Sequence, residues 1–196
     1  MADKHPNIVI FDLDETLIHS TREPLGREPE ICIETLHVYV RPFAYELIDS
    51  VARTCEVAVW SAGSEIYVDT IVEAIFPTHV KPIFVWNRNH CTAQMDGFPF
   101  GLLFLKDLTK VEPFGYDLSR TLIIEDDPVK VRDFKRNALI VQQYFGEKGD
   151  TELKDLTKYM ERVCIANDMR KHVKPRWRND LKRRFFGLRE AKQEMA

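Results

Sequence analysis

Two carboxylates and a hydroxyl lie directly after a short apolar run near the start of the chain. The run is residues 8–11 (Ile-Val-Ile-Phe), and Asp12, Asp14 and Thr16 follow it at alternate positions. An uninterrupted β-branched and aromatic run predicts a strand that is buried on both faces. Adjacent carboxylates repel each other unless a cation lies between them, and Mg²⁺ is commonly held by carboxylates together with water and phosphate. Because Asp-x-Asp loops are also common without a metal, the other polar loops must decide.

Three further apolar runs end in polar side chains that suit the same chemistry. Residues 55–60 end at Ser61, residues 102–105 end at Lys106, and residues 121–124 end at an acidic segment. In open α/β sheets ligands bind at the carboxyl ends of the strands, so these loops are expected to meet at one edge. The acidic segment consists of Glu125, Asp126 and Asp127.

These side chains together fit the transfer of a phosphoryl group. Asp12 is expected to be the nucleophile that forms an aspartyl phosphate. Asp14 is expected to protonate the leaving oxygen and then to activate water. Ser61, with the amides of Ala62 and Gly63, is expected to bind phosphate oxygens, as donors at a helix start do. Taken alone, Ser61 is equally well explained as the N-cap of a helix.

The negative charge of the phosphoryl group is expected to be balanced by Lys106 and Mg²⁺. Lys106 would also hold Asp12 in place. A lysine on its own is most often a surface residue, so this role depends on the other loops. The expected metal ligands are Asp12, Asp14 and Asp126, with Glu125 and Asp127 in supporting positions behind them.

The order of the predicted elements indicates an α/β protein. Apolar residues at helical spacing predict helices near 43–51, 66–75 and 151–162, and a short helix over 129–136. Strands alternating with helices favour a parallel sheet with helices on both faces. The side of the second helix that is expected to face the core carries Ile66, Thr70, Ile71, Ala74 and Ile75.

Two β-like segments interrupt this alternation. Residues 18–38 combine turn residues with alternating apolar positions, which predicts a loop and a short β-hairpin. Residues 81–105 are also β-like, and neither segment is long enough for a large cap domain. An open site favours a phosphate displayed on a macromolecule over an enclosed metabolite.

The composition is typical of a soluble globular protein of one ordinary domain. The chain has 196 residues, of which 44% are hydrophobic and 30% charged. No apolar run approaches the roughly 20 residues of a membrane span, and no signal peptide is visible. The four cysteines form no Cys-x-x-Cys pair, which favours reduced thiols in an intracellular compartment, cytoplasmic or nuclear.

Positive charge is concentrated at the C-terminus. Residues 170–196 contain ten Lys/Arg and three Asp/Glu, whereas the rest of the chain is acidic. Residues 1–165 are therefore predicted to form the domain, and 166–196 a basic and helical extension. The extension interleaves aromatic and basic residues, which suits nucleic acid, a membrane surface or an acidic partner. An amphipathic helix that packs on the acidic domain explains the pattern equally.

The motif at residues 12–20, Asp-Leu-Asp-Glu-Thr-Leu-Ile-His-Ser, resembles that of the haloacid dehalogenase (HAD) superfamily. Within it, the chain is similar to the FCP/SCP-like phosphatases from about Ile8 to Arg162. The resemblance implies a HAD-like Rossmannoid parallel sheet with small β insertions and no large cap. Further matching motifs are Val40-Arg41-Pro42, Trp60-Ser61-Ala62, Asn87-Arg88-Asn89-His90-Cys91, Leu105-Lys106-Asp107-Leu108 and Asp150-Thr151-Glu152-Leu153.

The resemblance assigns the same roles to Asp12, Asp14 and Lys106, and gives Thr16 a place supporting the phosphate-binding loop. Three positions depart from the family pattern. Ser61 stands where the family usually has Thr, which keeps the hydroxyl. Arg88 lies in a segment that resembles the family's Arg-Glu-x-Cys stretch near the phosphate, but Asn89 follows it. Glu125 replaces an aspartate and is one methylene longer.

The resemblance implies a Mg²⁺-dependent phosphatase that acts on phosphoserine or phosphothreonine in proteins, including the C-terminal domain of RNA polymerase II. Its substrate would be a phosphoprotein or phosphopeptide. The basic extension leaves open a nucleic-acid end or nucleotide phosphatase. A third alternative is a phosphatase-like binding module without activity, although the complete set of site residues argues against it.

Overall fold

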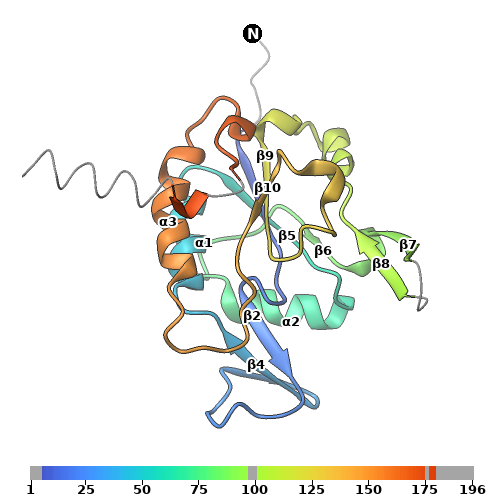
Figure 1. The fold of residues 1–196 in the computed structure, drawn as a ribbon, viewed down its shortest axis with the longest axis vertical. Coiled ribbons are helices and arrows are strands. Elements are labelled where there is room, and N and C mark those ends of the chain that lie inside the picture. Colours follow the sequence, from blue (N-terminus) through green and yellow to red (C-terminus); the bar gives the residue numbers. More distant parts are fainter. Residues whose placement is uncertain (1–5, 97–100, 175–176, 180–196) are drawn as a thin grey trace, which may run out of the picture.

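A five-stranded sheet forms the centre of the protein in a computed structural model, which describes residues 6–96, 101–174 and 177–179. Its strand order is β10-β9-β1-β5-β6, and every neighbouring pair is parallel (Figure 1). The α/β fold class is therefore confirmed. The strands are β1 (Ile8–Phe11), β5 (Glu56–Trp60), β6 (Val85–Trp86), β9 (Thr121–Glu125) and β10 (Ala138–Ile140).

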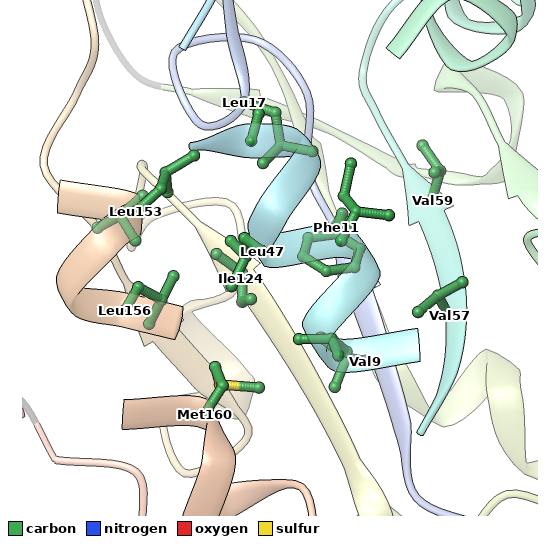
Figure 2. Packing of buried hydrophobic residues seen from close by; sticks show 14 of the residues in the cluster. Val9, Phe11, Leu17, Leu47, Val57, Val59, Ile124, Leu153, Leu156 and Met160 are labelled. Atoms are coloured by element: carbon green, nitrogen blue, oxygen red, sulfur yellow. The ribbon is translucent and has the colours of Figure 1, made fainter. Parts of the chain in front are cut away.

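Three α-helices pack on one face of this sheet: α1 (Ala44–Ala52), α2 (Glu65–Ile75) and α3 (Glu152–Val163). Val9 and Phe11 of β1 point to this face and share a core cluster with all three helices. Figure 2 shows Leu47 of α1 and Leu156 of α3 among the side chains of this cluster. Burial of this large apolar surface is the main force that holds the helices on the sheet.

The opposite face is covered by 3₁₀ segments instead of α-helices. Ile8 and Ile10 lie there in a second cluster with Leu108 and Val111 of η2 (Leu108–Phe114) and with Val131, which precedes η4 (Arg132–Phe134). Right-handed crossovers explain the division. The connections β1–β5 and β5–β6 step one way along the sheet, whereas β6–β9 and β9–β10 step the other way. Both faces of the sheet are therefore flanked by helices: α-helices on one face and 3₁₀-helices on the other.

The two β-like segments form separate antiparallel sheets. In the first, β2 (Ile18–Thr21), β4 (Leu36–Val40) and β3 (Ile31–Ile33) pair in the order β2-β4-β3. The second is the hairpin of β7 (Thr92–Asp96) and β8 (Gly101–Leu105). Small β insertions were predicted and are confirmed. However, the apolar run before Lys106 is a hairpin strand and does not belong to the central sheet.

Two local predictions are wrong in detail. In α2, Ile66 is 79% exposed and Ala74 is exposed, whereas Val68 is buried with Ile71 and Ile75. Residues five apart on a helix are separated by about 140°, so Ile66 cannot share a face with Ile71. The short helix predicted over 129–136 is a turn followed by the three-residue η4.

The packed part of the protein continues past residue 165. Trp177 is fully buried, and its indole N–H donates a hydrogen bond of 2.9 Å to the Ile140 carbonyl. Arg178 forms an ion pair with Glu152. These contacts agree with packing of the start of the extension on the domain, whereas residues 180–196 lie outside the described part. Among the described residues, no helix has the length and apolarity needed to cross a membrane.

Candidate active site

The carboxyl ends of β1, β5 and β9 meet at one edge of the sheet. β1 is hydrogen-bonded in parallel to both of the other strands, which places Asp12 between Ser61 and Glu125. The Asp12 amide donates to the Ile124 carbonyl at 3.0 Å, and the Ser61 amide donates to the Trp86 carbonyl at 2.9 Å. The predicted gathering of the loops at this edge therefore corresponds to the geometry.

Asp12 lies at the bottom of this edge with 1% of its surface exposed. The Lys106 ammonium contacts its Oδ1 at 2.5 Å and Glu125 Oε2 at 2.6 Å. The Thr16 hydroxyl donates to the other oxygen of Asp12 at 2.9 Å. Burial acts to lower the pKa of Lys106, but the charges of Asp12 and Glu125 outweigh it and raise that pKa, which keeps the ammonium charged.

Asp14 is held apart from Asp12 in its own hydrogen-bonded pocket. The Tyr67 hydroxyl donates to Asp14 Oδ1 at 2.5 Å, and the Ser61 hydroxyl donates to Oδ2 at 3.2 Å. Burial, and then the charge of Asp12, raises the pKa of Asp14. Glu15 follows with a φ of 58°, a left-handed conformation that is uncommon outside glycine and turns the chain sharply here.

Glu125 is engaged by four donors. Its Oε1 accepts from the Lys130 ammonium at 3.1 Å and from the amides of Asp126 and Asp127 at 3.2 and 3.3 Å. Its Oε2 accepts from Lys106. Burial and the charge of Asp12 raise the pKa of Glu125 to about 8, while the two lysines act in the other direction. Asp127 instead caps the turn, since its side chain accepts from the Val129 amide at 2.9 Å.

The carboxylates of Asp12, Glu125 and Asp126 could hold a metal ion. Each offers an oxygen, these oxygens lie within 4.8 Å of one another, and all three residues are buried. Carboxylate oxygens are the ligands that Mg²⁺ prefers, so the donor set fits the predicted cofactor. Asp14, which was predicted as a ligand, is not part of this cluster, and its carboxylate is hydrogen-bonded to Tyr67 and Ser61. Glu125 takes its place in the cluster.

Asp126 is held in place by the side chains of Gln143 and Thr16. The Gln143 side chain donates to its Oδ2 at 2.9 Å, and the Thr16 hydroxyl lies 3.4 Å from its Oδ1. Although burial opposes it, hydrogen bonding with Glu125, the charge of Lys130 and the hydrogen bond from Gln143 lower the pKa of Asp126. Thr16 thus bridges two carboxylates, which fits its predicted supporting place.

A cleft of about 500 Å³ opens from this site. Arg88 lies on its rim, where its Nε donates to the Ala62 carbonyl at 2.7 Å and its guanidinium stacks 4.9 Å from the Phe104 ring centroid. The Gly63 amide donates to the Ser61 hydroxyl at 2.9 Å. Residues that line the cleft are Asp14, Ile33, Glu34, Leu36, Ala62, Gly63, Ser64, Ile66, Tyr67, Arg88 and Lys130.

Three residues of the site were not predicted from the sequence: Tyr67, Lys130 and Gln143, whose side chain donates to Asp126. Tyr67 lies in the first turn of α2, a helix whose buried side was predicted with Ile66 in place of Val68. Lys130 lies four residues after Asp126 in the segment that was predicted as a short helix. Its ammonium contacts Glu125 and Asp126 at 3.1 and 3.5 Å. The one signal for Lys130 in the sequence is this spacing from an acidic residue.

Comparison with known protein families identifies the family of this chain. Residues 7–170 match the family model described as NLI interacting factor-like phosphatase. The chain belongs to this family. The match covers most of the chain and confirms the resemblance to FCP/SCP-like phosphatases, which are phosphoric monoester hydrolases.

Individual relatives of the chain are also named as phosphatases. The chain is 28% identical to CTD small phosphatase-like protein 2 of Dictyostelium discoideum, over 87% of this chain and 30% of that protein. It is 29% identical to the human carboxy-terminal domain RNA polymerase II polypeptide A small phosphatase 2, over 82% of this chain and 58% of that protein. The chain thus corresponds to part of these relatives.

A solved structure shares the fold of this family member. The structure of Fcp1, an essential RNA polymerase II CTD phosphatase, superposes with a TM-score of 0.63 at 15% identity. The superposition covers 81% of this chain and 62% of the other. At this identity the likeness concerns the fold alone, and it agrees with the parallel sheet and its small β insertions.

Proposed function

We propose that the chain is a Mg²⁺-dependent phosphatase that hydrolyses phosphoserine and phosphothreonine in proteins through an aspartyl phosphate on Asp12. The observation that carries the proposal is the different setting of the two neighbouring aspartates. Asp12 is paired with the buried Lys106, whereas Asp14 is held at the cleft with a raised pKa. One carboxylate is prepared for attack and the other for proton transfer.

In the first step, a carboxylate oxygen of Asp12 attacks the phosphorus as the bond to the leaving oxygen breaks. Protonated Asp14 gives its proton to that oxygen, and its raised pKa supports this role. In the second step, Asp14 takes a proton from water, and the water oxygen attacks the phosphorus. The bond to Asp12 then breaks and inorganic phosphate is released.

The remaining residues hold charge and position. Lys106 holds one carboxylate oxygen of Asp12 in place, and Thr16 orients the other. Arg88 lines the cleft and could contact the phosphate from the rim. Asp12 and Asp126, with Glu125 nearby, would hold Mg²⁺, which screens the negative charge between carboxylate and phosphate. Ser61 and Asp14 share a hydrogen bond that would be exchanged for one to the phosphate.

A macromolecular substrate is supported by the shape of the site. The cleft is open, its walls include Ile33 of β3, Leu36 of β4 and Tyr67 of α2, and the described residues contain no large cap over it. Relatives are named for the C-terminal domain of RNA polymerase II, so phosphopeptides of that domain are the first candidates. The cytoplasmic or nuclear location and a nucleic-acid or acidic partner of the basic extension stay predictions.

Asp12→Asn tests the reaction. With an aryl phosphate and Mg²⁺, this variant should lose about 10³-fold or more of the turnover rate, because the amide cannot form the acyl phosphate. Asp49→Asn, at a partly exposed aspartate on α1, is the matched control and should remain active. Full activity of Asp12→Asn would contradict the mechanism. Parallel assays with phosphopeptides and phosphorylated oligonucleotides identify the substrate class.

A further inference from the structure

Lys130 places a second ammonium group against the three-carboxylate cluster. Its Nζ lies 3.1 Å from Glu125 Oε1 and 3.5 Å from Asp126 Oδ1, and both residues belong to that cluster. Lysine carries a positive ammonium group at neutral pH, so this group contributes one positive charge to the cluster. The ammonium group of Lys130 therefore already neutralises part of the negative charge of the cluster that would hold a divalent metal ion.

Main-chain hydrogen bonds fix the backbone position of Lys130. The Lys130 amide donates to the Asp127 carbonyl at 3.2 Å, and the Lys106 amide donates to the Lys130 carbonyl at 2.8 Å. The neighbouring Val131 is buried in the core beneath the turn. Only the side chain is thus free to move, through four methylene groups.

The two lysines of the site differ in how firmly they are held. The Lys106 side chain is fully buried and contacts Asp12 and Glu125 at 2.5 and 2.6 Å. The Lys130 side chain is 20% exposed, and its two contacts are longer. If Lys130 moves away, Glu125 keeps Lys106 and two amide donors. Departure of Lys130 therefore leaves no buried carboxylate without a partner.

Space for the displaced side chain exists on both sides. Lys130 lines the cleft that contains Asp14 and Arg88. It also lines a second cavity of about 260 Å³, which includes Lys106 and Arg132. The side chain stands between the two, so a rotation about its methylene groups moves the ammonium off Asp126 without a change in the backbone.

We infer that Lys130 is a resident counter-cation of the metal site, which weakens the binding of a divalent ion and moves off Asp126 when that ion binds. The inference rests on the proposed function for its choice of metal. Repulsion between like charges a few ångströms apart is large at the effective dielectric constant of a partly buried site. Removing the charge of Lys130 should therefore tighten metal binding by about tenfold or more.

Direct titration of the substrate-free protein tests the inference. Mn²⁺ serves as the probe, and electron paramagnetic resonance measures the free ion. Lys130→Gln keeps a donor near Glu125 but removes the charge, and Lys130→Met removes both. Either variant should bind Mn²⁺ about tenfold or more tightly than the wild type. Lys130→Arg keeps the charge and should bind within about twofold of the wild type.

Lys158→Met is the matched control, since Lys158 lies on the exposed side of α3 beside Asp155. It changes the net charge equally and should leave the Mn²⁺ affinity unchanged. In the wild type, Mg²⁺ should also shift the ¹³Cε resonance of Lys130, which requires no variant to fold. Equal or weaker Mn²⁺ binding by the charge-removing variants, or an unmoved Lys130 resonance at saturating Mg²⁺, would overturn the inference.

None of these measurements depends on catalytic turnover, so they test the role of Lys130 separately from the proposed function. A protein that binds Mn²⁺ as expected but hydrolyses no phosphomonoester would refute the proposed function and still support the role of Lys130.

Discussion

At the scale of single residues, Asp12 and Asp14 show how one short loop supports two kinds of carboxylate. Asp12 faces an ammonium group at 2.5 Å, whereas Asp14 faces the neutral hydroxyls of Tyr67 and Ser61. The positive φ of Glu15 follows the second carboxylate and turns the chain there. The environments, and not the residue types, separate the two roles.

Tyr67→Phe should change the pH dependence of the reaction. The Tyr67 hydroxyl stabilises the ionised form of Asp14 and so lowers its pKa, against burial and Asp12, which raise it. Removing the hydroxyl should raise this pKa further. Because a general acid must be protonated, the rate of leaving-group departure falls as pH rises through its pKa, and this fall should move to higher pH in the variant.

The measurement is the pH profile of single turnover with an alkyl phosphate, whose leaving group needs a proton. The same profile with a 4-nitrophenyl leaving group is the internal control and should shift much less. Tyr45→Phe, on the exposed side of α1, should match the wild type with both substrates. A profile that shifts to lower pH in Tyr67→Phe would argue against Asp14 as the acid.

Most site residues at this scale could be predicted, because an apolar run followed by a polar residue marks the carboxyl end of a strand. That rule found Asp12, Ser61 and Glu125. Tyr67 and Lys130 could not be found in this way, since a helix and an irregular turn present them. Their contacts depend on where α2 and the turn lie in space, which local patterns do not encode.

At the scale of elements, one buried arginine ties three segments around the first loop. Arg41 follows β4, and its guanidinium binds both carboxylate oxygens of Asp150, at 3.0 and 2.9 Å. It also donates to the carbonyls of Thr16 and Gln142 at 3.1 and 2.8 Å. The insertion sheet, the site loop and the start of α3 are thereby joined through one side chain.

Arg41→Met should destabilise the fold by about 3–5 kcal/mol, because it leaves Asp150 and two carbonyls without their donor. Urea denaturation of the purified variant measures this free energy of unfolding. Arg53→Met is the matched control, since Arg53 pairs with Asp49 while 74% of its side chain is exposed. Equal stability losses in the two variants would show that burial of the Arg41 pair is unimportant.

The elements themselves were largely predictable, because strand runs such as 121–124 are apolar throughout and bounded by polar residues. The face of α2 was not, since two apolar stripes compete within its eleven residues. Val68 lies on the stripe that meets the sheet, and Ile66 lines the cleft instead. Tertiary packing determines which of the two stripes is buried, and helical spacing alone does not predict it.

At the scale of the whole molecule, the start of the C-terminal extension completes the core. Trp177 is buried in the same cluster as α1 and α3, with its ring 5.5 Å from that of Tyr159. Trp177→Ala should therefore cost about 3–5 kcal/mol of stability. Trp177→Phe should cost less, because it keeps most of the volume and loses only the hydrogen bond to Ile140.

Thermal unfolding followed by circular dichroism compares these two variants with Ile165→Ala. Ile165 is 72% exposed and should tolerate the change. Unfolding temperatures that agree for the Trp177 variants and the wild type would mean that the extension does not belong to the cooperative unit. The sequence showed a tryptophan among basic residues, which is compatible with a binding tail as well as with a core residue.

The position of β1 has a consequence for biosynthesis. Of the three strands β1, β5 and β9, β1 is synthesised first; β5 later pairs with one of its edges, and the other edge stays unpaired until β9 is made. While residues 61–120 are being synthesised, the apolar strand Ile8–Phe11 therefore presents an open edge, which is a template for association with other chains. A nascent chain of this protein is consequently expected to depend on chaperones until the ninth strand has left the ribosome.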